Sequence, residues 1–240
     1  MKRLLFPPLL ISLVFSSFIG LAENTAIQPA AKEGKWRERH EGFLAQAKQG
    51  GIELLFLGDS ITYGWQTDGQ TVWEKYFVPR HAANFGIGGD RTQHILWRIQ
   101  NGELDGIKPK VVVLMIGTNN TGQERDAGKV RNTTPEVIEG VTAVVKGLRG
   151  KLPKSKILLL AIFPRGERGS PIRDQVKEIN TALAKLDDGK KVKFLDIGPR
   201  FLESDGTLSE DIMPDLLHLS KKGYQIWAEA MESTLAALLK

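Results

Sequence analysis

Four short segments of this 240-residue sequence combine side chains that could do chemistry together. They are Gly58-Asp59-Ser60, Gly86 to Arg91, Gly117-Thr118-Asn119-Asn120 and Asp215-Leu216-Leu217-His218. A serine hydroxyl is a weak nucleophile until a histidine takes its proton, and the histidine needs a carboxylate to fix its tautomer. The segments supply one hydroxyl, one glycine-rich turn, one carboxamide and one Asp/His pair, which is the inventory of an acyl-transfer site.

Ser60, His218 and Asp215 are the predicted nucleophile, general base and orienting carboxylate. Asp215 and His218 stand three residues apart, so one helical turn or a tight loop lets the carboxylate hold the imidazole. Acyl transfer also needs donors aimed at the developing oxyanion. The Ser60 amide, the Gly89 amide and the Asn119 side-chain amide are the predicted oxyanion hole.

Each segment also has an ordinary interpretation. Gly58-Asp59-Ser60 alone is a common turn in which Asp or Ser caps the next helix. The glycine-rich turn departs from the dinucleotide fingerprint because Arg91 stands where the third glycine belongs. An acid at Asp59, directly after the first strand, repels phosphate. The conjunction of all four segments therefore favours acyl transfer over nucleotide binding.

The elements that must position these segments alternate along the chain. Five apolar runs predict strands: Ile52 to Leu57, Ala82 to Phe85, Val111 to Ile116, Ile157 to Phe163, and Val192 to Leu195. Helical periodicity predicts five helices. The first ends at Gly50, the second covers Gln93 to Ile99, the third runs from Thr134-Pro135 to Gly150, the fourth begins at Ser170-Pro171, and the fifth spans Lys221 to Leu239. This alternation predicts a parallel sheet in one three-layer α/β/α domain, residues 35–240, whose strand ends gather the four segments at one edge.

The first 22 residues are typical of a secretory signal peptide. Lys2 and Arg3 precede an apolar stretch from Leu4 to Ile19, and Gly20-Leu21-Ala22 supplies small residues for cleavage after Ala22. A membrane anchor is the alternative, but the apolar stretch is shorter than the roughly 20 residues that span a bilayer. Residues 23–34 are expected to form a linker, and the protein is expected to be secreted or periplasmic.

Composition excludes several other classes of protein. With 25% charged and 41% hydrophobic residues, the chain is neither low-complexity nor fibrous. Losing Lys2 and Arg3 with the signal peptide takes the formal charge from +5 to +3, which predicts no nucleic-acid partner. The absence of cysteine excludes disulfides and a thiol nucleophile. We expect no metal and no organic cofactor.

These segments resemble those of the SGNH, or GDSL-type, hydrolase superfamily. The similarity is greatest to the catalytic subunits of platelet-activating factor acetylhydrolase isoform Ib and their bacterial relatives, and it includes the strings Asn84 to Asp90 and Phe163 to Glu167. The resemblance implies a flavodoxin-like sheet in the order 2-1-3-4-5 and the same roles for Ser60, Asp215, His218, Gly89 and Asn119. Asn120 stands where many members of the superfamily have Asp. The signal peptide separates this chain from the cytosolic mammalian enzymes, so their regulatory partner is not expected.

The expected function is therefore that of a secreted serine esterase acting on short acyl groups, most of all acetyl. Ile61 and Leu217 flank the nucleophile and the base, and they either narrow the acyl pocket or point into the core. The substrate is an ester of a small molecule, a glycan or a lipid, with Trp65 and Trp73 as candidates for stacking on sugar rings. A glycan acetylesterase, a lysophospholipase and a catalytically inactive ligand-binding member remain the alternatives, and a homodimer stays open.

Overall fold

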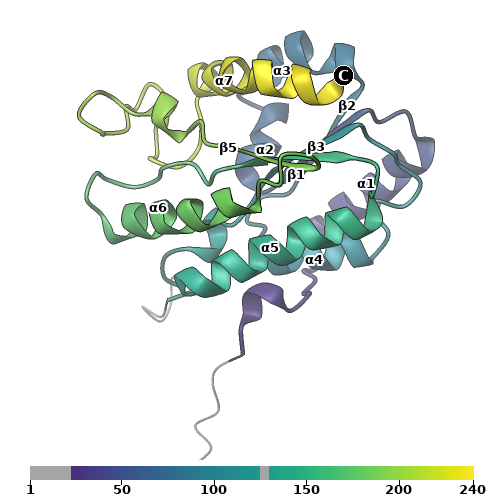
Figure 1. Cartoon of the computed structure of the whole chain (residues 1–240), viewed down its shortest axis with the longest axis horizontal. Helices are drawn as coiled ribbons and strands as arrows, with labels where there is room; N and C mark the ends of the chain where they lie inside the picture. The colour runs from purple at the N-terminus through teal and green to yellow at the C-terminus, as the bar shows by residue number, and fades with distance from the viewer. Residues whose placement is uncertain (1–22, 125–129) are drawn as a thin grey trace, which may run out of the picture.

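In the computed structural model, which describes residues 23–124 and 130–240, five parallel strands form one sheet in the order β2-β1-β3-β4-β5 (Figure 1). The strands are β1 (Leu54–Gly58), β2 (Ala82–Gly86), β3 (Val111–Met115), β4 (Lys156–Leu160) and β5 (Val192–Leu195). The predicted parallel sheet and its strand order are both confirmed. The predicted signal peptide, residues 1–22, lies outside the described residues.

Helices cover both faces of the sheet, because alternate strand residues are apolar on each side. The α-helices are α1 (Lys35–Gln49), α2 (Ser60–Tyr63), α3 (Gln70–Tyr76), α4 (Thr92–Gln100), α5 (Thr134–Lys151), α6 (Pro171–Leu183) and α7 (Lys221–Leu239). Leu55 and Leu57 face a core shared with α1, α4, α5 and α6, whereas Leu54 and Phe56 face a second core shared with α2, α3 and α7. Figure 1 shows α3 and α7 above the sheet and α4, α5 and α6 below it. The result is the predicted three-layer sandwich.

Helix α5 departs slightly from its predicted limits. Its N-cap is Thr133 rather than Thr134, because the Thr133 side chain and the Glu136 side chain each bond the other's backbone amide in a capping box. The helix also runs through Gly150 to Lys151, and the Leu152 amide still donates to the Leu148 carbonyl at 2.8 Å. A glycine alone does not end a helix whose apolar face remains packed.

Residues 23–34, which were expected to form a linker, pack against the domain. A 3₁₀ turn (Thr25–Ile27) lies on α4 and α5, where Ala26 is fully buried. The Thr92 hydroxyl donates to the Ala26 carbonyl at 2.7 Å, and the Ala30 amide donates to the Gln93 carbonyl at 3.1 Å. This N-terminal segment is therefore part of the folded domain.

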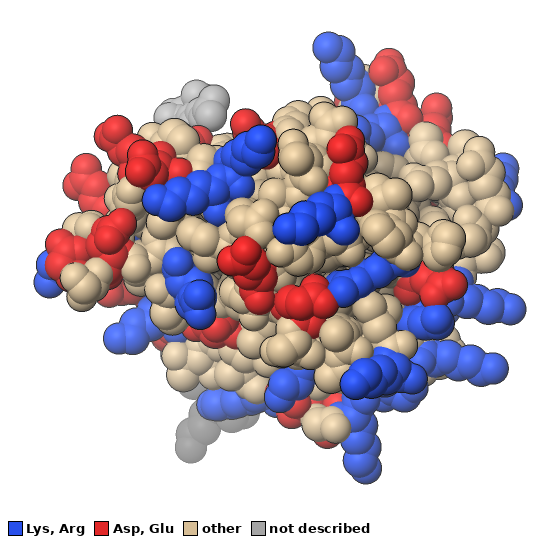
Figure 2. All heavy atoms as spheres, turned by 90° about the horizontal axis from the view of Figure 1, so that it is seen from above, with Lys and Arg blue, Asp and Glu red and all other residues tan. Residues whose placement is uncertain are grey.

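Charged side chains of both signs are interspersed over the face that α7 and α3 cover (Figure 2). This mixed pattern agrees with the modest net charge of the sequence. Among the described residues, no helix is both long enough and apolar enough to cross a membrane.

Candidate active site

Ser60 is the first residue of α2, at a tight turn that follows β1. Gly58 makes this turn feasible, since a Cβ there would lie 2.4 Å from the Met115 carbonyl oxygen. Asp59 caps the helix by accepting the Ile61 amide at 3.0 Å. The turn leaves the Ser60 side chain partly exposed at the carboxyl edge of the sheet.

His218 lies beside Ser60, although 158 residues separate them, with Ser60 Oγ 2.9 Å from His218 Nε2. His218 Nδ1 is 2.7 Å from Asp215 Oδ2, so the three predicted side chains form one chain of hydrogen bonds. Asp215 and His218 occupy a tight loop before α7, in which Leu216 has a positive φ of 57°. Asp215 Oδ1 holds this loop by accepting the amides of Leu217 at 3.1 Å and His218 at 2.7 Å.

These contacts determine which nitrogen of His218 carries the proton. Partial burial opposes ionisation of Asp215, but the hydrogen bonds from the His218 amide and ring hold the pKa of this carboxyl below its ordinary value. An ionised carboxylate only accepts hydrogen bonds, so Nδ1 must be the donor to Asp215. Nε2 is then an acceptor and faces the Ser60 hydroxyl as a base would.

The other three histidines are engaged elsewhere. His40 Nδ1 lies 3.2 Å from the buried Glu103 carboxylate, and His81 is exposed just before β2. Burial and nearby cations lower the pKa of His94 to about 3, and its Nδ1 accepts the Arg91 amide at 2.8 Å. None of the three approaches Ser60 within hydrogen-bond distance.

The glycine-rich turn after β2 runs alongside Ser60. A Cβ on Gly88 would lie 4.0 Å from Ser60 Cβ, and Gly89 has a φ of 71°, which favours glycine. The backbone amides of Ser60 and Gly89 have no acceptor among the described residues. Each of the two adjoining loops therefore contains an N–H group that has no acceptor among the described residues.

Asn119 follows β3 in a 3₁₀ turn (Thr118–Asn120). Its side-chain nitrogen donates to the Asp90 carbonyl at 3.0 Å, which connects this turn to the glycine-rich turn. One hydrogen of the Asn119 side-chain amide is used in that bond, and its other hydrogen has no acceptor among the described residues. Ser60, Gly89 and Asn119 were predicted to lie at the carboxyl edge of the sheet, and the three loops that carry them do meet there.

A buried ionic network beneath the glycine-rich turn was not predicted. The Asp90 carboxylate accepts Arg98 Nη1 at 2.6 Å and Trp36 Nε1 at 2.6 Å. Arg98 also donates to Glu103, and all three charged side chains are 0% exposed. Lys32, from the N-terminal segment, donates to the Gly89 carbonyl at 2.7 Å. This network fixes the backbone of Gly89 and Asp90 from below and from the side.

Asn120, the residue after Asn119, has a defined structural role. Its side-chain oxygen accepts the Thr92 amide at 3.0 Å, and its nitrogen donates to Gln93 and Asn132. The residue is fully buried. A neutral carboxamide thus joins the turn after β3 to the start of α4, and no carboxylate is needed there.

Asp59 is the one strongly perturbed acid next to Ser60 in the described structure. Complete burial raises the pKa of its carboxyl to about 7, although the Ile61 amide opposes the shift. Its second oxygen, Oδ2, is buried without a hydrogen-bond partner. Near neutral pH this side chain is therefore poised between its acid and carboxylate forms.

The structure shows how exposed the side chains are that were expected to contact the acyl group or a sugar ring. Ile61 is 1% exposed within the core beneath α7, which favours the interpretation that it points into the core. Leu217 is partly exposed and packs against the same core, next to His218. Trp65 is fully buried and is therefore unable to stack on a sugar. Trp73 is partly buried and packs against the same core.

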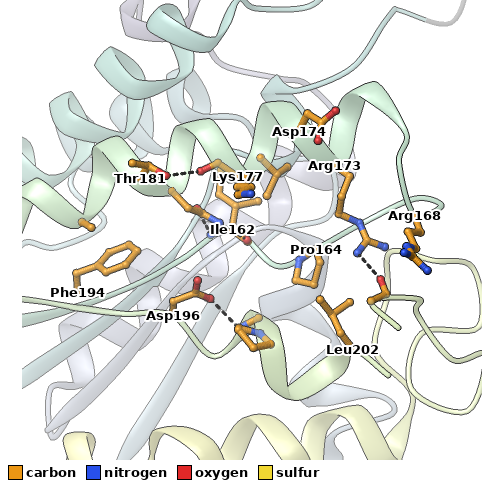
Figure 3. A pocket seen from close by; sticks show the side chains of 16 residues that line it. Ile162, Pro164, Arg168, Arg173, Asp174, Lys177, Thr181, Phe194, Asp196 and Leu202 are labelled. Carbon is orange, nitrogen blue, oxygen red and sulfur yellow. Dashed lines mark hydrogen bonds between the residues drawn. The ribbon is translucent and has the colours of Figure 1, made fainter. Parts of the chain in front are cut away.

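A cavity of about 650 Å³ lies between α6 and the turn at residues 198–202 (Figure 3). Apolar residues such as Ile162, Phe194 and Leu202 line it, and Arg168 and Arg173 stand near its edge. None of the predicted site residues lines this cavity. The described residues also contain no cluster of three or more His, Asp or Glu side chains that could hold a metal ion.

Comparison with known proteins connects this geometry to a family. The model of the GDSL-like Lipase/Acylhydrolase family matches residues 56–226, a range that includes Ser60, Asp215 and His218. Platelet-activating factor acetylhydrolase IB subunit alpha1 of Homo sapiens is 39% identical over 220 residues, covering 91% of this chain and 90% of the relative. Subunit alpha2 of Rattus norvegicus is 38% identical over 223 residues, covering 90% and 93%.

Solved structures share the fold at lower identity. A GDSL-like lipase from Bacteroides thetaiotaomicron has a TM-score of 0.62 at 19% identity, covering 83% of this chain and 97% of its own. A variant of an acetylxylan esterase from Geobacillus stearothermophilus has a TM-score of 0.59 at 20% identity, covering 79% and 94%.

Proposed function

Because the chain belongs to the GDSL-like lipase/acylhydrolase family, we propose that it is an exported serine esterase that releases acetyl groups from ester substrates. The observation that carries the proposal is the hydrogen-bonded chain from Ser60 Oγ through His218 to Asp215. Export is proposed from the N-terminal sequence alone, since residues 1–22 have the pattern of a signal peptide.

The first half-reaction forms an acyl-enzyme. Ser60 Oγ attacks the ester carbonyl carbon while its proton passes to His218 Nε2, and Asp215 stabilises the resulting imidazolium. The amides of Ser60 and Gly89 and the side chain of Asn119 are the proposed donors to the carbonyl oxygen as it gains negative charge. The tetrahedral intermediate then collapses, and the Nε2 proton is transferred to the departing alcohol.

The second half-reaction returns the enzyme to its starting state. Water gives a proton to His218 Nε2 and attacks the acyl carbon, and the second intermediate releases a carboxylic acid as Ser60 recovers its proton. In each half-reaction, His218 accepts one proton from the nucleophile and passes it to the leaving group.

The acetyl group is favoured because both named types of relative act on acetyl esters: an acetylhydrolase by sequence and an acetylxylan esterase by fold. Their names indicate different alcohols: a lipid for the platelet-activating factor acetylhydrolase and a glycan for the acetylxylan esterase. Burial of Trp65 removes one candidate for sugar stacking but does not favour a lipid by itself. A homodimer stays a prediction, which light scattering of the purified protein tests.

Turnover of p-nitrophenyl esters by the purified protein tests the proposal. Ser60→Ala should reduce hydrolysis of the acetate on the order of ten-thousand-fold or more. Ser233→Ala, on the exposed side of α7, is the matched control and should retain wild-type activity. Equal activity of the two variants would contradict the assignment, and a preference for the octanoate over the acetate would contradict the acetyl specificity.

A further inference from the structure

Arg165 lies between the two loops that carry opposite sides of the candidate site. Its Nη1 donates to the Thr118 carbonyl at 2.9 Å and contacts the Thr118 hydroxyl at 3.3 Å, and Thr118 directly precedes Asn119. The amide of the next residue, Gly166, donates to the Leu216 carbonyl at 2.8 Å. Leu216 stands between Asp215 and His218, so Arg165 adjoins both the oxyanion side and the base.

Arg173 holds the backbone of Arg165 in place from the α6 side, and its Nη1 also donates to the Gly206 carbonyl at 3.2 Å (Figure 3). Its Nη2 donates to the Gly166 carbonyl at 2.7 Å and its Nε to the Arg165 carbonyl at 3.3 Å. The backbone that presents Arg165 is thus fixed from two directions. A guanidinium held in this way loses little conformational entropy when it binds a ligand.

The charge of Arg165 has no direct counter-ion in the described structure. No carboxylate among the described residues lies within 4 Å of it, and within the same residues its Nε and Nη2 have no hydrogen-bond partner. Partial burial lowers the pKa of Arg165, with Arg131 acting in the same direction. The guanidinium nevertheless remains protonated.

Two acids, Asp59 and Asp215, act on the pKa of Arg165 in the opposite direction, but neither forms an ion pair with it. Asp215 is hydrogen-bonded to His218, and Asp59 is buried beneath the nucleophile with a pKa of about 7. Arg131 lies on the same side, with its Nη1 3.2 Å from the Asn119 carbonyl, and its charge is paired with Glu124, 3.6 Å from its Nε. Arg165 therefore presents a charge without an ion-pair partner beside the site, and its Nε and Nη2 have no acceptor among the described residues.

We propose that Arg165 binds an anionic group, a carboxylate or a phosphate, carried by the alcohol portion of the ester. The inference rests on the proposed esterase function. His218 delivers its proton to the leaving oxygen, so the alcohol portion lies on the His218 side, where Arg165 stands. Carboxylate and phosphate both accept two parallel hydrogen bonds from a guanidinium.

Three aryl acetates test this substrate class: 4-acetoxybenzoate, 4-acetoxyphenyl phosphate and the neutral methyl 4-acetoxybenzoate. For each ester, kcat/KM is measured for the wild type, Arg165→Gln and Arg165→Lys. Dividing wild-type by variant values cancels the different intrinsic reactivities of the esters. Arg168→Gln is the matched control, because Arg168 is exposed in the same loop and lies 3.8 Å from Asp205.

Arg165→Gln should lower kcat/KM for the anionic esters about tenfold more than for the methyl ester, mainly through KM. Arg165→Lys should restore part of the difference, and Arg168→Gln should produce none. The two anionic esters separate carboxylate from phosphate recognition. In the wild type, raising the salt concentration should reduce the preference for the anionic esters, a readout that requires no variant to fold.

An equal loss for all three esters would overturn the inference, because it would show that Arg165 only supports the Thr118 turn. Undiminished preference for anionic esters in Arg165→Gln would also overturn it. Calorimetric binding of 4-acetoxybenzoate to Ser60→Ala separates the two proposals. Arg165-dependent binding without any wild-type turnover would contradict the esterase function and support the anion site.

Discussion

The side-chain amide of Asn119 donates to the backbone carbonyl of Asp90 at 3.0 Å, and this bond joins the loops after β3 and β2. The same residue, Asp90, directs its carboxylate downward to Arg98 and Trp36. Two proposed oxyanion donors, Gly89 and Asn119, are therefore positioned through one buried acid. We therefore expect the geometry of the site to depend on this buried ionic network.

Asp90→Asn should destabilise the fold by about 3–5 kcal/mol, because Arg98 would lose one of its two buried counter-ions. Urea unfolding measures this change. Asp105→Asn is the matched control: Asp105 forms an exposed ion pair with Lys151, and its loss should cost less than about 1 kcal/mol. Similar values for the two variants would show that the Asp90 pair contributes little.

Asn119→Ala should lower kcat by about 10²–10³ with a much smaller effect on KM, since the lost donor acts on charge that develops only in the transition state. Steady-state kinetics on p-nitrophenyl acetate provides the measurement. Asn119→Asp keeps the side-chain shape but replaces the donor with a negative charge, so it should be at least as impaired. Near-wild-type kcat in either variant would remove Asn119 from the oxyanion hole.

Lys32→Met should lower kcat up to about fivefold, because one hydrogen bond of roughly 1 kcal/mol to the Gly89 carbonyl is lost. The substitution keeps an unbranched apolar stem but removes the charged amino group. Lys35→Met is the control, since Lys35 is exposed at the start of α1. If the two variants have the same kcat, the N-terminal segment does not help to position Gly89.

The Asp59 carboxyl should make folding stability fall as the pH rises. Its folded-state pKa of about 7 exceeds the ordinary value of 3.8, so between these values the folded state holds a proton that the unfolded chain has released. Ionising the buried group therefore costs folding free energy. Asp59→Asn should gain stability relative to wild type by up to about 4 kcal/mol between pH 4 and pH 8, at about 1.4 kcal/mol per pKa unit.

Urea unfolding of both proteins across this pH range measures the Asp59 effect. Any constant cost of burying the asparagine amide cancels in the comparison between pH values. A stability difference that does not change with pH would show that Asp59 ionises freely in the folded state.

Periodicity in the sequence was sufficient to predict the sheet and the helices that pack on it. Runs such as Val111 to Met115 are apolar on both faces, and this is the signature of a central parallel strand. The proximity of Ser60 to His218 followed from the rule that strand ends share an edge, together with the family resemblance. These features depend on local pattern and topology, which a single sequence contains.

The supporting network depends on contacts that local pattern does not specify. Trp36 lies on the buried face of the helix that was predicted to end at Gly50, yet its indole nitrogen donates to Asp90. Arg98 stands three residues after Ile95 and therefore on the buried side of α4. An arginine at such a position indicates a buried acidic partner, so the sequence contained this sign of the network. The short helices α2 and α3 were also missed, because four and seven residues display too little periodicity.

Packing of the N-terminal segment was hidden for a similar reason. Ala26 is buried because Gly140 on α5 leaves room for it: a Cβ on Gly140 would lie 3.0 Å from Ala26 Cβ. These residues are more than a hundred positions apart, and the segment itself has no apolar periodicity. Its composition resembles a linker although its contacts are those of a folded element.

Covalent labelling of the purified protein with a fluorophosphonate, followed by peptide mapping, tests the assignment of Ser60 most directly. We predict one adduct, on the peptide that contains Ser60, formed by the folded protein, slowed by excess acetate ester and absent after denaturation or in His218→Ala. Labelling of a different residue, or no adduct at Ser60 in a folded protein that hydrolyses p-nitrophenyl acetate, would contradict Ser60 as the nucleophile.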